Sequence, residues 1–301
     1  MPALTGDLAR PLALARIGLG VGTVLFALEM AVVLSRIAHG AVRLPVLPGV
    51  PDPTIPTVLA VTGLMVLAGI CLAVGLFARP AAWAATLLNV ALLLWDQQAY
   101  SHHAWLLTSL LPWLALSAPD RALAVRRVRH CGPAAAWAPM LLMTQLSLCY
   151  LFAGASKLNE GFLSGEPFAQ WLRLDLPIEL HQGLAVGAVG TELFLAFALW
   201  FRRTRRLGVA AGVGLHLSIL VLMPDGTLPF AAFAVICLSL YPLFGRLAEG
   251  QADSMSGPET GVTIRSGGTM PESASTSSAR HSSSSNASSG GGPSSTVTTQ
   301  S

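Results

Sequence analysis

The sequence predicts an all-α fold, a polytopic membrane bundle of about eight transmembrane helices. Two properties of the 301-residue chain support this class. Hydrophobic residues make up 53% and charged residues 11% of the chain, with a mean hydropathy of +0.61, whereas about a quarter of a soluble domain is charged. Several apolar runs also approach or exceed the ~18 residues that a membrane helix needs. We therefore expect a multi-pass protein of the cell membrane, with the lipid bilayer as its surroundings.

Each predicted helix is an apolar run that ends where proline, glycine or charged residues begin. The proline-rich segment 46–56 separates the first two runs, and a loop of mixed polarity over 159–182 follows the fifth. Apolar periodicity and these breaks predict helices at 12–35, 57–78, 80–95, 103–118, 134–157, 183–201, 207–223 and 228–245.

The composition changes near residue 246 from apolar to serine, threonine and glycine. A segment of that composition has too few apolar side chains to form a core. We therefore expect a transmembrane domain over 10–245 and a disordered cytoplasmic tail over 246–301.

Arginine is concentrated on one side of the predicted bundle. With eight helices, the turns after the fourth and sixth helices lie on the same side as both termini. These turns contain Arg121, Arg126, Arg127, Arg129, Arg202, Arg203, Arg205 and Arg206. The positive-inside rule makes that side cytoplasmic, so both termini are predicted to be cytoplasmic. The net charge of +3 does not indicate a nucleic-acid partner, because the arginines lie in short loops between apolar runs.

Lys157 is the only lysine in the sequence, and it stands at the end of a predicted membrane helix. Arginine stays protonated at any ordinary pH, whereas a desolvated lysine can lose its proton. A titrating role explains why lysine occurs here alone. The alternative is a snorkelling side chain at a helix end, where carbonyl groups also favour a cation.

Several other ionisable residues are predicted at the depth of Lys157, in the outer half of the bundle. They are Glu29, His102, His103, Glu192 and His216. Such groups face a bundle interior or a cavity when they lie in a membrane, so they predict a site. Alternatively they pair with one another and hold helices together. No metal is expected, because these histidines lack an HExxH-like spacing.

Two small residues precede Lys157 on its own helix face. Ala153 and Gly154 lie four and three positions before it, which leaves open space beside the amine. Small residues also let neighbouring helices approach closely, which is the packing interpretation of the same pattern.

The segment around Lys157 resembles a known family. Residues 150–158 read YLFAGASKL and residues 162–165 read FLSG, similar to a Y-x-x-A-G-x-x-K-L … W-x-x-G stretch of the HTTM domain. That is the membrane domain of vitamin K-dependent gamma-carboxylase and its bacterial relatives, which include the membrane component of a sporulation-delaying toxin maturation system. The resemblance covers about 10–245 and extends to His103-Ala-Trp-Leu and Leu215-His216-Leu-Ser.

The resemblance implies roles for the residues that match. In the carboxylase, the lysine at the position of Lys157 is the base that deprotonates reduced vitamin K, and the histidine at the position of His103 supports it. Carried over, Lys157 and His103 are the expected catalytic residues. His216, Glu192, Tyr150 and His102 are then expected to line the cavity.

The leading interpretation is an HTTM-like protein with an outward-facing, lysine-centred site that acts on a quinol or a secreted peptide. It implies a carboxylase- or epoxidase-like activity with reduced vitamin K or menaquinol, and a secreted peptide or protein as a partner. The alternative is a non-enzymatic membrane protein for maturation, export or immunity of a secreted peptide. A small transporter is a third interpretation, although no inverted repeat supports it. Phe162 departs from the family pattern, which has tryptophan there.

Overall fold

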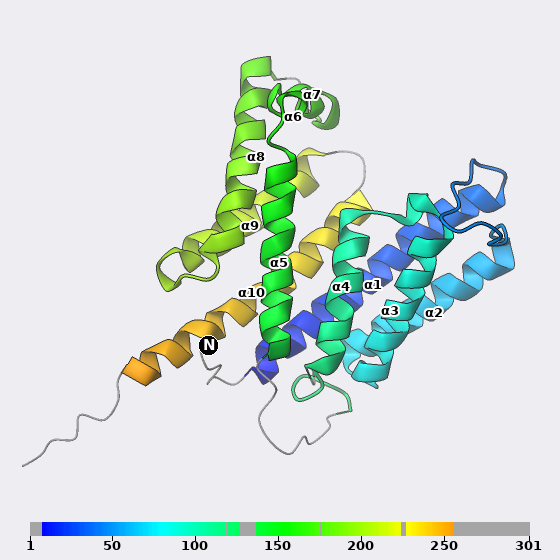
Figure 1. Cartoon of the computed structure of the whole chain (residues 1–301), viewed down its shortest axis with the longest axis horizontal. Coiled ribbons are helices and arrows are strands. Elements are labelled where there is room, and N and C mark those ends of the chain that lie inside the picture. Colours follow the sequence, from blue (N-terminus) through cyan, green and yellow to red (C-terminus); the bar gives the residue numbers. More distant parts are fainter. Residues whose placement is uncertain (1–7, 118, 127–136, 175, 224–226, 256–301) are drawn as a thin grey trace, which may run out of the picture. The chain divides into compact units, whose positions relative to one another are not determined.

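The computed structural model describes residues 8–117, 119–126, 137–174, 176–223 and 227–255. These residues form helices, with one isolated bridge between Pro45 and Asp96. Figure 1 shows the elements in chain order, and their bounds are α1 Ala9–Ala38, α2 Ile55–Val74, α3 Ala78–Trp95, the short 3-10 helix η1 Gln97–Ala99, α4 His102–Leu116, α5 Trp137–Ser156, α6 Glu160–Leu163, α7 Glu166–Trp171, α8 Ile178–Ala198, α9 Arg202–Leu222 and α10 Thr227–Met255. The all-α prediction is confirmed.

All eight predicted helices occur, and their ends differ from the prediction by a few residues. The largest differences at helix starts are at α8, which begins at Ile178 instead of 183, and at α9, which begins at Arg202 instead of 207. The prediction placed 178–182 in a loop because Glu179, His181 and Gln182 make this stretch polar. Pro177 directly precedes the helix and Glu179 lies in its first turn, and both residue types favour a helix start.

The predicted loop 159–182 also contains the short helices α6 and α7. The Asn159 side chain accepts a hydrogen bond from the Phe162 backbone N–H at 2.9 Å and so caps α6. Gly165 separates α6 from α7 with φ +81°, and a Cβ there would lie only 2.6 Å from the Gln182 backbone nitrogen. Glycine therefore allows this turn to pack directly against the start of α8.

Helix α10 continues to Met255, ten residues beyond the predicted end of the transmembrane domain at 245. The extension begins Arg246-Leu-Ala-Glu, and these residue types have high helix propensity. The rest of the predicted tail, 256–301, lies outside the described residues.

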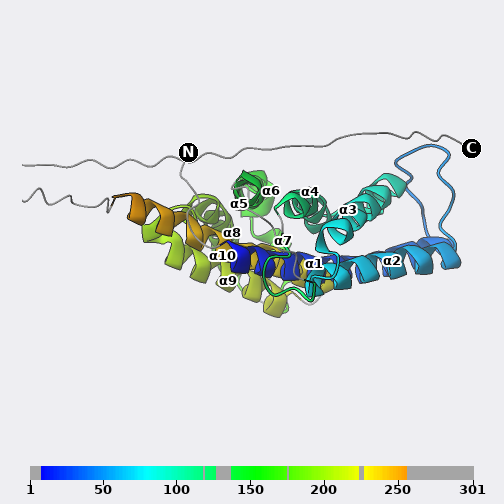
Figure 2. The same ribbon diagram turned by 90° about the horizontal axis from the view of Figure 1, so that it is seen from below.

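The long helices pack in two layers. Figure 2 shows α3, α4 and α5 side by side over α1, α2 and α10, and each of these neighbouring pairs is in contact. Helix α8 packs against α5, and α9 packs against both α8 and α10. Helix α4 contacts α1, α3, α5 and α10, and most of its leucines are fully buried.

Among the described residues, seven helices are long and apolar enough to cross a membrane. The eighth predicted span, α4, has 15 residues and measures about 22 Å along its axis. It contacts four other helices, while Trp105 on its outer face is 57% exposed, so its length is less constrained by the hydrocarbon thickness than that of a helix exposed to lipid on most sides.

Close packing of α1 against α2 depends on two glycines that face each other. A Cβ on Gly20 would lie 2.7 Å from the Gly69 carbonyl oxygen, and a Cβ on Gly69 would lie 2.8 Å from the Gly20 carbonyl oxygen. Neither position has room for a side chain. Small residues at such a crossing are the usual basis of helix association in membranes.

Arg16 is fully buried near the start of α1 and binds backbone carbonyls from two other segments. Its Nη1 donates to Pro119 O at 3.2 Å and to Ala122 O at 3.4 Å, and its Nη2 donates to Ala73 O at 3.4 Å and to Leu123 O at 2.5 Å. Asp120 also interacts with it electrostatically. The guanidinium thereby ties the end of α2 and the segment after α4 to α1.

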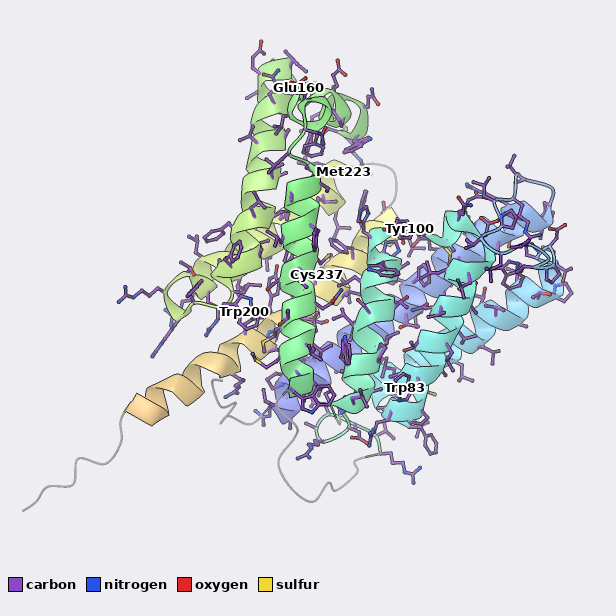
Figure 3. The ribbon with its side chains drawn as sticks, viewed as in Figure 1. Trp83, Tyr100, Glu160, Trp200, Met223 and Cys237 are labelled. Carbon is purple, nitrogen blue, oxygen red and sulfur yellow. The ribbon has the colours of Figure 1, made fainter. Side chains whose placement is uncertain are left out.

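The long helices alternate in direction, so their ends gather at two ends of the bundle. These two ends differ in their basic residues. Figure 3 labels Trp83 and Trp200 towards one end, and Tyr100 and Glu160 towards the other. The first end holds the arginine-rich turn at 202–206, and the second holds Lys157. We call them the arginine end and the lysine end.

Replacing Arg16 by methionine should destabilise the bundle, because the change leaves buried carbonyl oxygens without donors. We expect a loss of about 3 kcal/mol in the free energy of unfolding, seen as a lower thermal midpoint in detergent. Arg10→Met in the same helix is the matched control, since Arg10 is exposed. Equal midpoints for the two variants would contradict this role of Arg16.

The predicted orientation can be checked by cysteine labelling of intact cells. With the native cysteines replaced by alanine, Glu160→Cys at the lysine end should react with a membrane-impermeant maleimide. Arg203→Cys at the arginine end should react only after permeabilisation, because the positive-inside rule places it in the cytoplasm. The reverse pattern would place Lys157 on the cytoplasmic face.

Candidate functional site

Lys157 follows the last turn of α5 and forms an ion pair with Glu192 of α8 through Oε1 of the carboxylate. The Lys157 side chain is 31% exposed and that of Glu192 is 9% exposed. The amine also lies 5.6 Å from the centroid of the Phe162 ring, within the range of a cation–π contact. The lone lysine is therefore held by a carboxylate and an aromatic face.

The packing interpretation of the small residues before Lys157 applies to Gly154. A Cβ on Gly154 would lie 2.9 Å from side-chain atoms of Leu193, the residue after Glu192. Helices α5 and α8 thus approach each other closely one turn before the ion pair, and this approach brings the amine within reach of the carboxylate.

A cavity of about 360 Å³ adjoins the ion pair between α7, α8 and α9. Its wall is formed by Lys157, Phe162, Phe168, Trp171, Leu172, Gly183, Leu184, Gly187, Ala188, Thr191, Glu192, Ala211, Leu215, Ser218, Ile219, Leu222 and Met223. Gly183 and Glu192 are nine residues apart on α8, which corresponds to about 13 Å along the helix. Glu192 therefore marks the inner end of the cavity, and α7 lies at its outer end.

The hydroxyl groups of the cavity wall are bound to their own helices. Thr191 Oγ1 donates to Gly187 O at 2.7 Å, and Ser218 Oγ donates to Leu215 O at 2.8 Å. In contrast, Oε2 of Glu192 is buried and accepts no hydrogen bond from any described residue. The ion pair is thus where the wall can exchange hydrogen bonds with a ligand.

Aromatic rings line the outer end of the cavity. The ring centroids of Phe162 and Phe168 are 5.5 Å apart, and Trp171 lies 6.2 Å from Phe168 and 6.5 Å from Phe162. The segment that carries these rings is fixed beyond α7 by the Arg173 backbone N–H, which donates to Leu222 O at 3.0 Å. Together with the Gly165 turn on α8, this bond holds the segment at two points.

His103 does not lie on this cavity. Its Nε2 is 2.6 Å from Oε2 of Glu29 and 3.3 Å from the Ser101 hydroxyl, and its ring packs edge-on to Phe26. His103 therefore joins α4 to α1, in agreement with the pairing alternative for these ionisable residues.

His216 and Tyr150 belong to a third polar cluster, and His216 lies on a different face of α9 from the cavity wall. The Tyr150 hydroxyl lies 2.9 Å from His216 Nε2 and 2.8 Å from the Tyr241 hydroxyl, and all three side chains are buried. A Cβ on Gly212 would lie 2.0 Å from the Tyr241 hydroxyl, so glycine makes room for it. This cluster links α5, α9 and α10.

The expectation that Lys157, His103 and His216 line one cavity is wrong. The wall that contains Lys157 and Glu192 includes neither His103, His216 nor Tyr150, because each of these binds a partner on another helix. His102 is the exposed histidine at the start of α4 and interacts electrostatically with Glu192. Among the described residues, no three His, Cys, Asp or Glu side chains are arranged to hold a metal ion.

Comparison with known proteins gives a family. The HTTM domain matches residues 9–244, which span α1 to most of α10 and include Lys157 and Glu192. The chain belongs to the HTTM family. Searches of the curated proteins and of the solved structures gave no match. With seven helices able to cross a membrane among the described residues, it is an integral membrane HTTM protein.

Two aromatic residues of this HTTM protein's cavity, Phe168 and Trp171, were absent from the prediction. Their spacing of three, after Phe162, could have indicated one face of a short helix. The surrounding Gly165, Pro167 and charged residues instead favoured a loop. His181 was also missed; it is buried on α8, and its Nε2 has no hydrogen-bond partner among the described residues.

Tyr150→Phe should destabilise this HTTM protein, because the change removes both hydrogen bonds of the Tyr150 hydroxyl and leaves the buried His216 imidazole without that partner. The expected loss is about 1–3 kcal/mol, measured as a lower thermal midpoint in detergent. Tyr100→Phe is the control, since Tyr100 is 60% exposed. A Tyr150→Phe midpoint as high as that of the control would show that the cluster adds nothing to stability.

Proposed function

We propose that this HTTM protein resides in the cell membrane and binds a quinol, such as reduced vitamin K or menaquinol, in the cavity between α7, α8 and α9, with Lys157 as the base. The observation that carries the proposal is the Lys157–Glu192 ion pair at the inner end of an otherwise apolar cavity. A quinol has the matching composition, with polar hydroxyls on a flat apolar ring.

The cavity suits such a ligand in size and lining. Its volume of 360 Å³ is within the range of small-molecule sites, which are mostly apolar with a few placed polar groups. The rings of Phe162, Phe168 and Trp171 offer faces and edges for contact with another ring. Small and aliphatic residues of α8 and α9, with Thr191 and Ser218, form most of the remaining wall.

The ion pair has no net charge, which favours a neutral ligand over an anionic one. It also shares one proton between two groups, which can lie on Lys157, as ammonium beside carboxylate, or on Glu192, as amine beside carboxylic acid. Excluding water from the cavity reduces the difference between these two forms, because separated charges lose solvation there. In the second form the Lys157 amine is free to accept a proton.

The proposed step is a proton transfer within the cavity. The O–H bond of the ligand breaks, its electron pair stays on oxygen, and a new N–H bond forms on Lys157. The resulting ammonium lies beside the new oxyanion and stabilises it. A bound quinol would supply the oxygen-dependent chemistry that in gamma-carboxylase drives carboxylation of glutamate, and a secreted peptide or protein would then be the second substrate.

The Lys157→Arg variant tests whether Lys157 acts as the base. Arginine supplies a cation to Glu192 but stays protonated, so the variant should insert and fold normally yet lose activity by at least about a hundredfold. Hydroquinone-dependent dioxygen uptake in proteoliposomes is the measurement. Lys157→Ala should also be inactive and should be partly restored by small amines such as ethylamine.

Ser156→Ala is the matched control for these variants, because the Ser156 hydroxyl donates only to the Ala153 carbonyl of its own helix. It should keep full activity. An active Lys157→Arg variant would show that Lys157 is not the base and that its role is structural. The non-enzymatic role in maturation, export or immunity of a secreted peptide would then replace the proposal.

A further inference from the structure

Glu192 holds a carboxylate oxygen that no described residue satisfies. Oε1 accepts from Lys157, whereas Oε2 is buried and has no donor. A buried carboxylate oxygen without a donor costs more free energy than an ordinary lost hydrogen bond, because a charged acceptor loses stronger hydration when it is buried. A ligand that brings a donor to this oxygen removes that cost.

The wall around Glu192 offers no substitute donor. The nearest hydroxyl along α8 is that of Thr191, which already donates to Gly187 O, and the Ser218 hydroxyl on α9 donates to Leu215 O. Glu192 lines the cavity, and the last torsion of a glutamate is broad, so a turn of the carboxylate can bring Oε2 towards a ligand while the carboxylate stays next to the Lys157 amine. A donor on the occupant of the cavity can therefore reach this oxygen.

The two redox forms of a quinone differ in this respect. A hydroquinone hydroxyl donates one hydrogen bond and accepts another. In the ammonium–carboxylate form of the pair, one hydroxyl can therefore donate to Glu192 and accept from Lys157. In the amine–carboxylic acid form, the same hydroxyl can turn its O–H to the Lys157 nitrogen, which is the arrangement for the proposed proton transfer. The oxidised form has carbonyl oxygens, which accept from Lys157 but offer nothing to Oε2 and bring a second acceptor close to it. Sites built to bind a hydroxyl discriminate strongly against analogues that lack it.

We infer that Glu192 makes the cavity selective for the reduced, hydroxyl-bearing form of its ligand over the oxidised form. This inference rests on the proposed quinol site and adds a specificity-determining residue to it. It also gives a direction to ligand exchange, because oxidation of the bound ligand removes its donor to Oε2 and weakens its hold on the site.

The test compares the binding of two probes to the full chain in lipid nanodiscs without dioxygen. The probes are 2-methyl-1,4-naphthohydroquinone and 2-methyl-1,4-naphthoquinone, and binding is followed by quenching of tryptophan fluorescence, since Trp171 lies on the cavity wall. Empty nanodiscs correct for partition into lipid, and Trp171→Phe identifies the signal from the cavity. The hydroquinone should bind the native chain about ten- to a hundredfold more tightly than the quinone.

Glu192→Gln should reduce this preference to about onefold to threefold, because a carboxamide can donate to a quinone carbonyl as well as accept from a hydroxyl. Glu179→Gln is the matched control, with the same chemical change in an exposed residue of the same helix. It should keep the native ratio.

The outcomes separate the inference from the proposed function. Equal affinities of the native chain for the two probes would overturn the selectivity and leave the quinol site in place, whether or not any variant folds. A preference that survives in folded Glu192→Gln would assign it to another group and overturn the role of Glu192. Failure of both probes to bind the native chain would overturn the proposed function and the inference with it.

Discussion

The need to pair polar side chains inside an apolar medium determines how this bundle is joined. Water is absent from the hydrocarbon core, so each buried polar group must find a protein partner or contribute an energetic cost. Arg16 finds backbone carbonyls, His103 finds Glu29, and Tyr150 finds His216 and Tyr241. Each of these contacts joins different helices and therefore fixes how they pack.

The Lys157–Glu192 pair differs from those contacts in what remains after pairing. This pair borders the cavity and keeps one carboxylate oxygen without a donor. The Arg16 Nε atom also has no partner among the described residues, but Arg16 is not part of the cavity wall. A cluster whose polar groups all form hydrogen bonds with one another contributes to the stability and specificity of packing. A cluster that is left incomplete beside a cavity is suited to binding, because the ligand supplies the last hydrogen bond.

The sequence predicted the helices well because apolar length and helix breaks are local properties. It also singled out Lys157, because a lone lysine among arginines is visible in composition. It could not separate Glu192 from His103 and His216, since all lie at a similar depth and only their facing direction distinguishes them. That direction depends on close helix contacts such as the one between Gly154 and Leu193, which follow from packing of the whole bundle. The helices α6 and α7 were missed because tertiary contacts, rather than helical propensity, stabilise such short pieces.

The segment that contains α7, at the outer end of the cavity, affects how quickly a ligand is exchanged, whereas contacts with Glu192 affect how tightly the ligand is bound. Gly165 seats the turn before α7 on α8, and the Arg173 backbone N–H bonds to the end of α9, so α7 is attached at both of its ends. Passage at this end requires local opening of the segment, whose free energy is independent of the contacts that the ligand makes with Glu192. Exchange of a ligand past α7 is therefore governed by a backbone hydrogen bond and a glycine turn that are not part of the Lys157–Glu192 pair.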